Sequence, residues 1–152
     1  MGKFLIAIVI VVGLLYGLAL AIPVDPEEQR PGLRLSGQMA ANQSGEWSEY
    51  AGKSRKIWVQ TATWYGIAHS VTTISFEVDG TVYVPCRDCE AKRWPRNVEG
   101  NPDVTLKIDS KLYERRAVPI TAPADLARLR AALPAPPDVP RERLAIFRID
   151  PR

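Results

Sequence analysis

Three basic side chains that are able to hold an anion lie within five residues of one another, at Lys92, Arg93 and Arg96. A helix is expected to begin here, because Pro95 suits a first helical turn and Gly100 suits a C-terminal cap. Free N–H groups and the dipole at a helix N-terminus favour an anion. The stretch therefore predicts a phosphate site. The alternative is a solvated basic face, since charged side chains usually lie at the surface.

Two cysteines, Cys86 and Cys89, precede this basic stretch and are the only ones in the chain. In an exported domain, which the N-terminus predicts as described below, this spacing favours a local disulfide. A redox-active pair, free thiols and metal binding stay open. A zinc site needs about four ligands, and two cysteines with the lone His69 do not supply them without acids or a second subunit. We predict no metal site, and no catalytic side chain, because nucleophile motifs and glycine-rich phosphate loops are absent from the sequence.

The composition is that of an ordinary globular protein with one domain. The 152 residues are 46% hydrophobic and 24% charged, and the formal net charge is +3. Because this charge is small and the basic residues are interleaved with acids, nucleic acid is not expected as a partner.

The N-terminus predicts a membrane anchor. Phe4 to Ile22 carries no charge and follows Lys3, and a spanning helix needs about 20 apolar residues. A signal peptide is the alternative, because Ala19-Leu20-Ala21 fits a cleavage pattern. Lys3 precedes the segment and acids follow it, so the positive-inside rule leaves the N-terminus in the cytoplasm. The domain is then expected on the periplasmic side, tethered to the membrane, or soluble and exported if the segment is cleaved.

Hydrophobic periodicity beyond residue 22 predicts one mainly β domain. Residues 1–22 are expected to form the anchor or signal peptide, 23–32 a linker, and 33–152 the domain. Alternation with a period of two predicts strands, Asp79-Gly80 predicts a hairpin, and an apolar stripe predicts a helix over Ala124–Leu133. The expected strands are Leu33–Met39, Ile57–Thr63, His69–Val78, Thr81–Val84, Val104–Ile108, Lys111–Ile120 and Leu144–Ile149. Six to seven strands with two short helices fit an antiparallel β-barrel.

Aromatic side chains are expected to pack on or inside this barrel. Trp47 and Tyr50 lie in a polar loop, residues 40–54, and should pack back onto the barrel. Trp58, Trp64 and Tyr65 are expected to fill the barrel, with the roof of a ligand site as the alternative. His69 is either a hydrogen-bonded structural residue or a member of a binding site.

The order of the central elements matches a known family. These elements are strand His69–Val78, the Asp79-Gly80 turn, strand Thr81–Val84, a basic helix with Asn97-Val98, and Asn101-Pro102-Asp103-Val104-Thr105-Leu106. In this order they resemble the split β-barrel flavin-binding superfamily, which includes pyridoxamine-phosphate-oxidase-like proteins and deazaflavin-dependent nitroreductases. The pattern Trp94-x-x-Asn97-x-x-x-Asn101-Pro102-x-Val104 resembles the nitroreductase branch. The resemblance covers roughly residues 33–149.

This resemblance implies a homodimer with FMN or a deazaflavin of the F420 type in a groove between the subunits. The cofactor would supply hydride or two-electron chemistry and the protein would orient it. Ser70, Val71 and Thr72 would line the ring, beside His69, whose protonation would place a positive charge near a reduced flavin. Lys92 and Arg93 would meet the cofactor phosphate, and Trp94 and Asn97 would support the helix.

The sequence departs from the family pattern at three points. The domain is expected outside the cytoplasm, two cysteines occupy the loop after the hairpin, and no second phosphate-binding arginine stands on the strand before Pro85. We therefore carry two hypotheses. The first is a membrane-anchored flavin- or deazaflavin-dependent oxidoreductase of unknown substrate. The second is a cofactor-free split barrel that serves as a binding or assembly module at the membrane surface.

Overall fold

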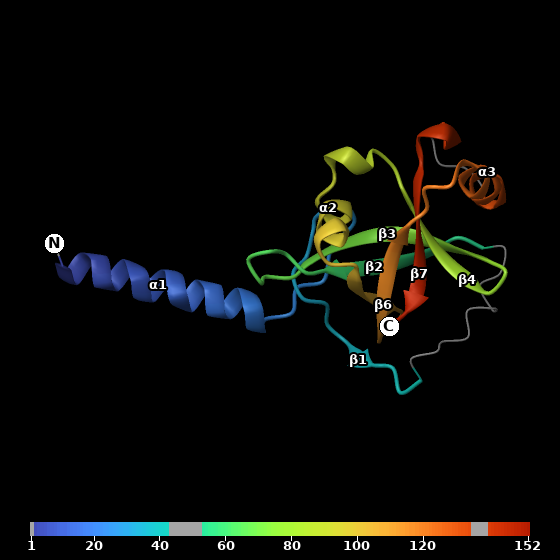
Figure 1. The fold of residues 1–152 in the computed structure, drawn as a ribbon. Helices are drawn as coiled ribbons and strands as arrows, with labels where there is room; N and C mark the ends of the chain where they lie inside the picture. The colour runs from blue at the N-terminus through green and yellow to red at the C-terminus, as the bar shows by residue number, and fades with distance from the viewer. Residues whose placement is uncertain (1, 43–52, 135–139) are drawn as a thin grey trace.

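Six strands close into an antiparallel barrel in the computed structural model, which describes residues 2–42, 53–134 and 140–152 (Figure 1). The strands follow the order β6-β5-β2-β3-β4-β7, and β7 pairs back with β6. A short strand, β1, lies outside the barrel and pairs in parallel with β6. The strands are β1 (Gln38–Met39), β2 (Arg55–Thr61), β3 (His69–Val78), β4 (Thr81–Cys86), β5 (Asp103–Ile108), β6 (Lys111–Pro119) and β7 (Ala145–Pro151). The predicted mainly β, antiparallel barrel is confirmed.

Local sequence explains why the central hairpin forms where it does. Asp79 and Gly80 connect β3 to β4, and both have positive φ, 53° and 77°. A two-residue turn with positive φ at both positions matches the twist of the flanking strands. In β2, Ile57 and Val59 are fully buried while the intervening Trp58 is partly exposed, as the period-two pattern predicts.

Strand β4 is longer than expected, because it continues through Pro85 to Cys86. It pairs with β3 only as far as Tyr83, whereas it pairs with β7 to Cys86. Proline has no backbone N–H to donate to a neighbouring strand. Pro85 is tolerated because β3 has already separated from β4 at this point, so no carbonyl of β3 is left without a donor. This separation leaves a gap along the first half of β3.

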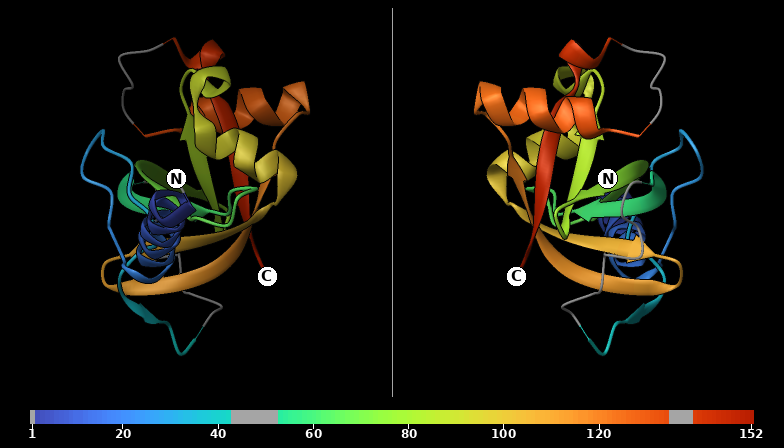
Figure 2. Two further views of the ribbon diagram at one scale, coloured as in Figure 1. Left: turned by 90° about the vertical axis from the view of Figure 1, so that its left-hand side faces the viewer. Right: turned by 90° about the vertical axis from the view of Figure 1, so that its right-hand side faces the viewer.

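Two helices complete the domain, α2 (Arg93–Gly100) and α3 (Pro123–Ala132), both on the upper side of the barrel in Figure 2. Trp94 and Val98 of α2 join the apolar cluster inside the barrel. Leu129 of α3 and Leu133, which follows it, pack with Phe76 and other residues of β3, β4 and β7 in a second cluster. The predicted leucine stripe therefore docks α3 on the barrel, as expected. Two short 3-10 turns, Cys89–Ala91 and Arg141–Arg143, precede α2 and β7.

The segment before the barrel is less regular than the expected strand Leu33–Met39, of which only Gln38–Met39 is in a strand. The residues before Gln38 cross the barrel surface without forming a strand. They make isolated bridges, one between Pro23 and Arg34 and one between Gly32 and Ser70. Strand pairing of this segment depends on residues far along the chain, which local alternation does not specify. The expected positions of Trp47 and Tyr50 fall outside the described residues.

Helix α1 (Gly2–Ala21) extends away from the barrel (Figure 1). Residues Lys3–Ala21 are long and apolar enough to cross a membrane, with a mean hydropathy of 2.8. A signal sequence at this position has the same length and composition.

Candidate functional site

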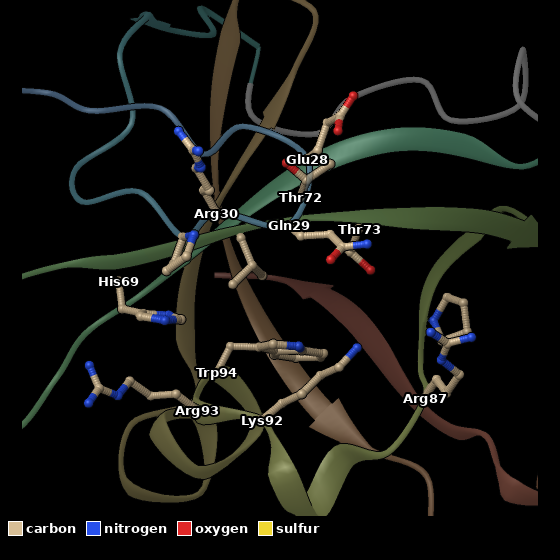
Figure 3. Close-up of a pocket in the computed structure, with 13 residues that line it drawn as sticks. Glu28, Gln29, Arg30, His69, Thr72, Thr73, Arg87, Lys92, Arg93 and Trp94 are labelled. Carbon is tan, nitrogen blue, oxygen red and sulfur yellow. The ribbon is translucent and has the colours of Figure 1, made fainter.

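An open cleft of about 440 Å³ lies in the gap between β3 and β4. Its walls come from residues 28–31 of the segment before the barrel, from the first half of β3, and from the loop that leads into α2 (Figure 3). Small-molecule and cofactor sites usually have volumes of about 300–1,000 Å³. The cleft is thus large enough for a ligand of that size.

Six of the eight sequence-predicted site residues line this cleft. They are His69, Val71, Thr72, Lys92, Arg93 and Trp94. Ser70 is fully buried beneath it. Asn97 instead faces a smaller cleft of about 230 Å³, and its Nδ2 donates a hydrogen bond of 2.9 Å to Oγ1 of Thr61. That hydrogen bond ties α2 to β2 and suits the supporting role expected for Asn97.

Positive charge dominates the lining of the cleft. Arg30, Arg87, Lys92 and Arg93 contribute cations, and Glu28 is the acid among the lining residues. Lys92 has no ion pair within the described part of the chain, and Arg87 has only an exposed contact of 3.6 Å with Asp88. In Figure 3, Lys92 and Arg87 lie on one side of Trp94, Arg93 and His69 lie on the other, and the guanidinium of Arg30 points away. The cleft therefore favours an anionic ligand.

The surroundings of His69 disfavour the charged form of its imidazole. Burial lowers its pKa below the ordinary 6.5, and the nearby charge of Arg93 lowers the pKa further. Its Nδ1 atom is buried and has no hydrogen-bond partner among the described residues. His69 thus lines the cleft with a ring whose charged form is disfavoured.

Ser70 is less available to a ligand than the resemblance implied. Its backbone N–H and C=O are both paired with Gly32, at 3.0 and 2.9 Å. Its Oγ is buried and unpaired within the described residues. Thr72 lies near the same segment, with its Oγ1 3.5 Å from the carbonyl oxygen of Pro26. Part of the β3 edge is therefore covered by the segment before the barrel.

A disulfide joins Cys86 and Cys89 at the end of β4, with a Cα–Cα distance of 5.6 Å. Asp88, between the two cysteines, has a positive φ of 49°, which Asp tolerates better than most residues. The closed loop carries Arg87 into the cleft. Within residues 2–42, 53–134 and 140–152, no cluster of three or more His, Cys, Asp or Glu side chains is arranged to hold a metal.

Two cationic residues of the cleft, Arg87 and Arg30, were missed by sequence reasoning. Arg87 lies two residues after Pro85, just beyond the stretch of strand on which the family pattern places a second phosphate-binding arginine. Its position between two cysteines was the signal that could have found it. Arg30 reaches the cleft only because residues 28–31 cross the barrel, and no local pattern marks that path.

The aromatic residues of the β2–β3 region have different positions from those expected. Trp58 lies on the outer side of β2, and its Nε1 donates a hydrogen bond of 3.1 Å to the carbonyl of Pro26. Trp64 is 94% exposed, so it neither fills the barrel nor roofs the cleft. It meets Tyr65 edge to face, with ring centroids 5.3 Å apart. The expectation of a barrel-filling role is wrong for Trp64 because the β2–β3 connection projects from the barrel.

Comparisons with known proteins give a likeness in structure and no match in sequence. No protein-family model matches the chain, and no curated protein matches it. Among solved structures, a chain titled "F420 Reductase" is similar to this one, with a TM-score of 0.44 and 18% sequence identity. The match covers 71% of this chain and 94% of that chain.

Proposed function

We propose that this protein is a membrane-anchored, flavin- or deazaflavin-binding protein of the oxidoreductase type, with a cofactor in the cleft beside β3. The observation that carries the proposal is that Arg87 and Lys92 lie on one side of Trp94, and Arg93 on the other, in a cleft of cofactor size. The cations come from a disulfide-closed loop and from the start of a helix. The substrate is left open.

Phosphate recognition is the best-supported part of this proposal. Lys92 has three donors and Arg87 has a planar fork of donors, and both types of cation bind phosphate well. Lys92 is the N-cap residue of α2, where backbone N–H groups also favour an anion. A single acid, Glu28, opposes four cations on the lining. A ligand with one or more phosphates would therefore be held at the Trp94 end of the cleft.

A planar ring would extend from the phosphate along β3. Val71 and Trp94 provide apolar surface, and Thr72 and His69 provide polar groups at its edge. A flavin or deazaflavin supplies hydride transfer when bound, and these residues would position the ring and exclude water from one face.

The remaining parts of the proposal concern location and assembly. Helix α1 would anchor the chain, and the distribution of Lys3 and the following acids would place the barrel on the periplasmic side. Two copies would form a homodimer and enclose the open side of the cleft. The membrane anchor, the periplasmic location and the homodimer can each be tested separately from cofactor binding.

The visible absorption spectrum of the purified full chain in mild detergent tests the proposal. We expect either a bound flavin-type chromophore or its appearance after incubation with FMN or a deazaflavin, retained through gel filtration. A folded chain that shows no chromophore and takes up neither compound would overturn it. Circular dichroism on the same sample establishes that the barrel is folded.

A cofactor-free binding module is the second candidate, and one observation favours it. The backbone of Ser70, expected to face a ring, is already paired with Gly32. If the segment before the barrel occupies the cofactor edge of β3, the barrel would act without a cofactor, through a surface other than the basic cleft. In that case Lys92→Ala and Arg93→Ala would leave the function of the protein intact.

A further inference from the structure

The connection between β2 and β3, residues 62–68, carries no charge, and Ala62, Trp64 and Gly66 within it are exposed. It reads Ala-Thr-Trp-Tyr-Gly-Ile-Ala. Trp64, at 94%, is the most exposed large hydrophobic residue in the described part of the chain, α1 included. A tryptophan this exposed costs free energy in water, because its large apolar ring stays hydrated. Within the described residues its ring meets only Tyr65, edge to face, among aromatic partners.

The same connection touches the apolar helix α1. The hydroxyl of Tyr16 donates a hydrogen bond of 2.5 Å to the backbone carbonyl of Tyr65. A Cβ placed on Gly66 would lie 3.2 Å from that hydroxyl oxygen. Figure 1 shows this connection reaching from the barrel toward the end of α1. Trp64, next to Tyr65, therefore lies close to the helix that would span the membrane.

The contact fixes the depth of Trp64 relative to a bilayer. Tyr16 lies five residues before Ala21, the last residue of α1, which is about 7.5 Å along a helix that rises about 1.5 Å per residue. The interfacial region of a bilayer is roughly 5–8 Å thick on each side. If the roughly 30 Å of α1 span the hydrocarbon core, Tyr16 lies about 7.5 Å inside the boundary at Ala21, so the connection that Tyr16 contacts reaches the edge of the core. Trp and Tyr are enriched at that level because their rings are apolar and their edges polar.

Two arginines of α2, Arg93 and Arg96, lie beside the connection. The Nη1 of Arg93 donates to the hydroxyl of Tyr65 at 3.2 Å. Arg96 lines the same shallow cleft as Trp64. Cations beside an interfacial aromatic residue complement the phosphates of lipid headgroups. The charge therefore favours a lipid surface over an apolar protein groove.

We propose that residues 62–68 form a membrane-docking loop, in which Trp64 enters the headgroup region of the bilayer that α1 spans. This inference rests on the membrane anchor of the proposed function, and it adds a second contact between the barrel and the lipid. Anchor and loop together would hold the barrel in one orientation. The end of the cleft that carries His69 and Arg93 would then lie near the bilayer surface.

Tryptophan fluorescence of the full chain in lipid vesicles tests the docking loop. The chain is reconstituted in vesicles of neutral and anionic lipid, with or without bromine on the upper part of the acyl chains. We expect brominated lipid to remove the emission of one tryptophan out of the four in the chain. The quenching should disappear in Trp64→Phe and persist in Trp58→Phe, the matched control, because Trp58 packs under Pro26.

Flotation of the same samples with their vesicles separates the loop from the anchor. A chain that floats but shows equal quenching in wild type and Trp64→Phe overturns the docking loop and leaves the anchor standing. A chain that stays with the lipid-free fraction overturns both. Acrylamide then identifies the alternative. A Trp64 that acrylamide quenches lies in water, and a Trp64 shielded from both quenchers is covered by protein, such as a second copy of the chain. Either outcome contradicts the proposal.

Discussion

Arg93 and Tyr65 are joined by a hydrogen bond of 3.2 Å between Nη1 and the phenolic oxygen. Arg93 lines the basic cleft, and the backbone of Tyr65 accepts a hydrogen bond from α1. One side chain thus links the candidate cofactor site to the part of the barrel nearest the apolar helix. If the loop docks on lipid, molecules dissolved in the bilayer interface have a short path to the cleft.

Removal of a cleft cation should weaken FMN binding. A hydrogen bond to a charged group contributes about 1.5–3 kcal/mol, so Lys92→Ala or Arg87→Ala should raise the Kd for FMN roughly 10- to 100-fold. Arg128→Ala is the matched control, because Arg128 is a cation on α3 that pairs with Asp79 away from the cleft. Isothermal titration of each purified variant measures the effect. Equal Kd values in all three variants would place the phosphate elsewhere.

The pKa of His69 should lie below 6.5 in the folded chain. Burial disfavours the charged imidazolium and Arg93 repels it, so the native state loses its proton at a lower pH than the unfolded chain. NMR follows this titration cleanly because His69 is the only histidine. Arg93→Ala should move the midpoint upward, toward the ordinary value. A wild-type midpoint at or above 6.5 would contradict the described environment.

The same shift predicts how stability depends on pH. The His69 contribution is complete above about pH 6.5 and is lost as the pH falls through the folded-state pKa, because the unfolded chain binds a proton there and the native chain does not. Chemical denaturation at several pH values measures this dependence. In the His69→Gln variant, this dependence of the free energy of unfolding on pH should be absent between pH 6.5 and the folded-state pKa of His69.

Asp25 should tie the segment before the barrel to β5. Its carboxylate forms an ion pair with Lys107 and accepts a hydrogen bond of 2.8 Å from the backbone of Ser36. Asp25→Asn is expected to lower the free energy of unfolding by about 1.5–3 kcal/mol. Glu99→Gln, an exposed change on α2, should have little effect. A similar loss in both variants would mean that the segment does not depend on this pair.

Low pH should weaken the contacts of Asp25 with Lys107 and Ser36. Burial alone raises the pKa of Asp25, but hydrogen bonds from Lys107 and Ser36 outweigh burial and hold the pKa below 3.8. The stability that Asp25 contributes is therefore present above about pH 4 and lost as the pH falls through the lowered pKa. The difference between wild type and Asp25→Asn should shrink accordingly at low pH.

Reduction of the disulfide should weaken anion binding more than it weakens the fold. The bridge closes a loop of only a few residues, so its effect on the entropy of the unfolded chain is small. The loop holds Arg87 at the cleft, and its release disorders that side chain. We expect a higher Kd for FMN after reduction, with little change in the unfolding midpoint. In Arg87→Ala, reduction should change the Kd much less.

Local patterns predicted most of the barrel. The strand β3, the Asp79-Gly80 turn and the leucine stripe of α3 each depend on residues that are close in sequence, so period and turn chemistry identified them. The path of residues 23–36 did not follow from local pattern, because it depends on pairing with Ser70 and Lys107. The extension of β4 through Pro85 could not be predicted from local pattern, because it depends on where β3 separates from β4.

The candidate site was predicted only in part. Lys92, Arg93 and Trp94 follow from the basic helix and the family resemblance. Arg30 was out of reach, because it depends on how a segment without regular structure crosses the barrel. Trp64 was misplaced, since an aromatic residue beside a strand usually packs inward, and only the structure reveals that this connection projects toward α1.

The affinity ratio between FMN and riboflavin tests the central claim most directly, because these ligands share the ring and differ in the phosphate. Fluorescence titration of the full chain should give a Kd for FMN at least about 10-fold lower than that for riboflavin. The ratio should approach one in the Arg87→Ala/Lys92→Ala double variant and stay unchanged in Arg128→Ala. Equal affinities in the wild type, or no binding of either compound to the folded chain, would contradict a flavin-type cofactor in this cleft.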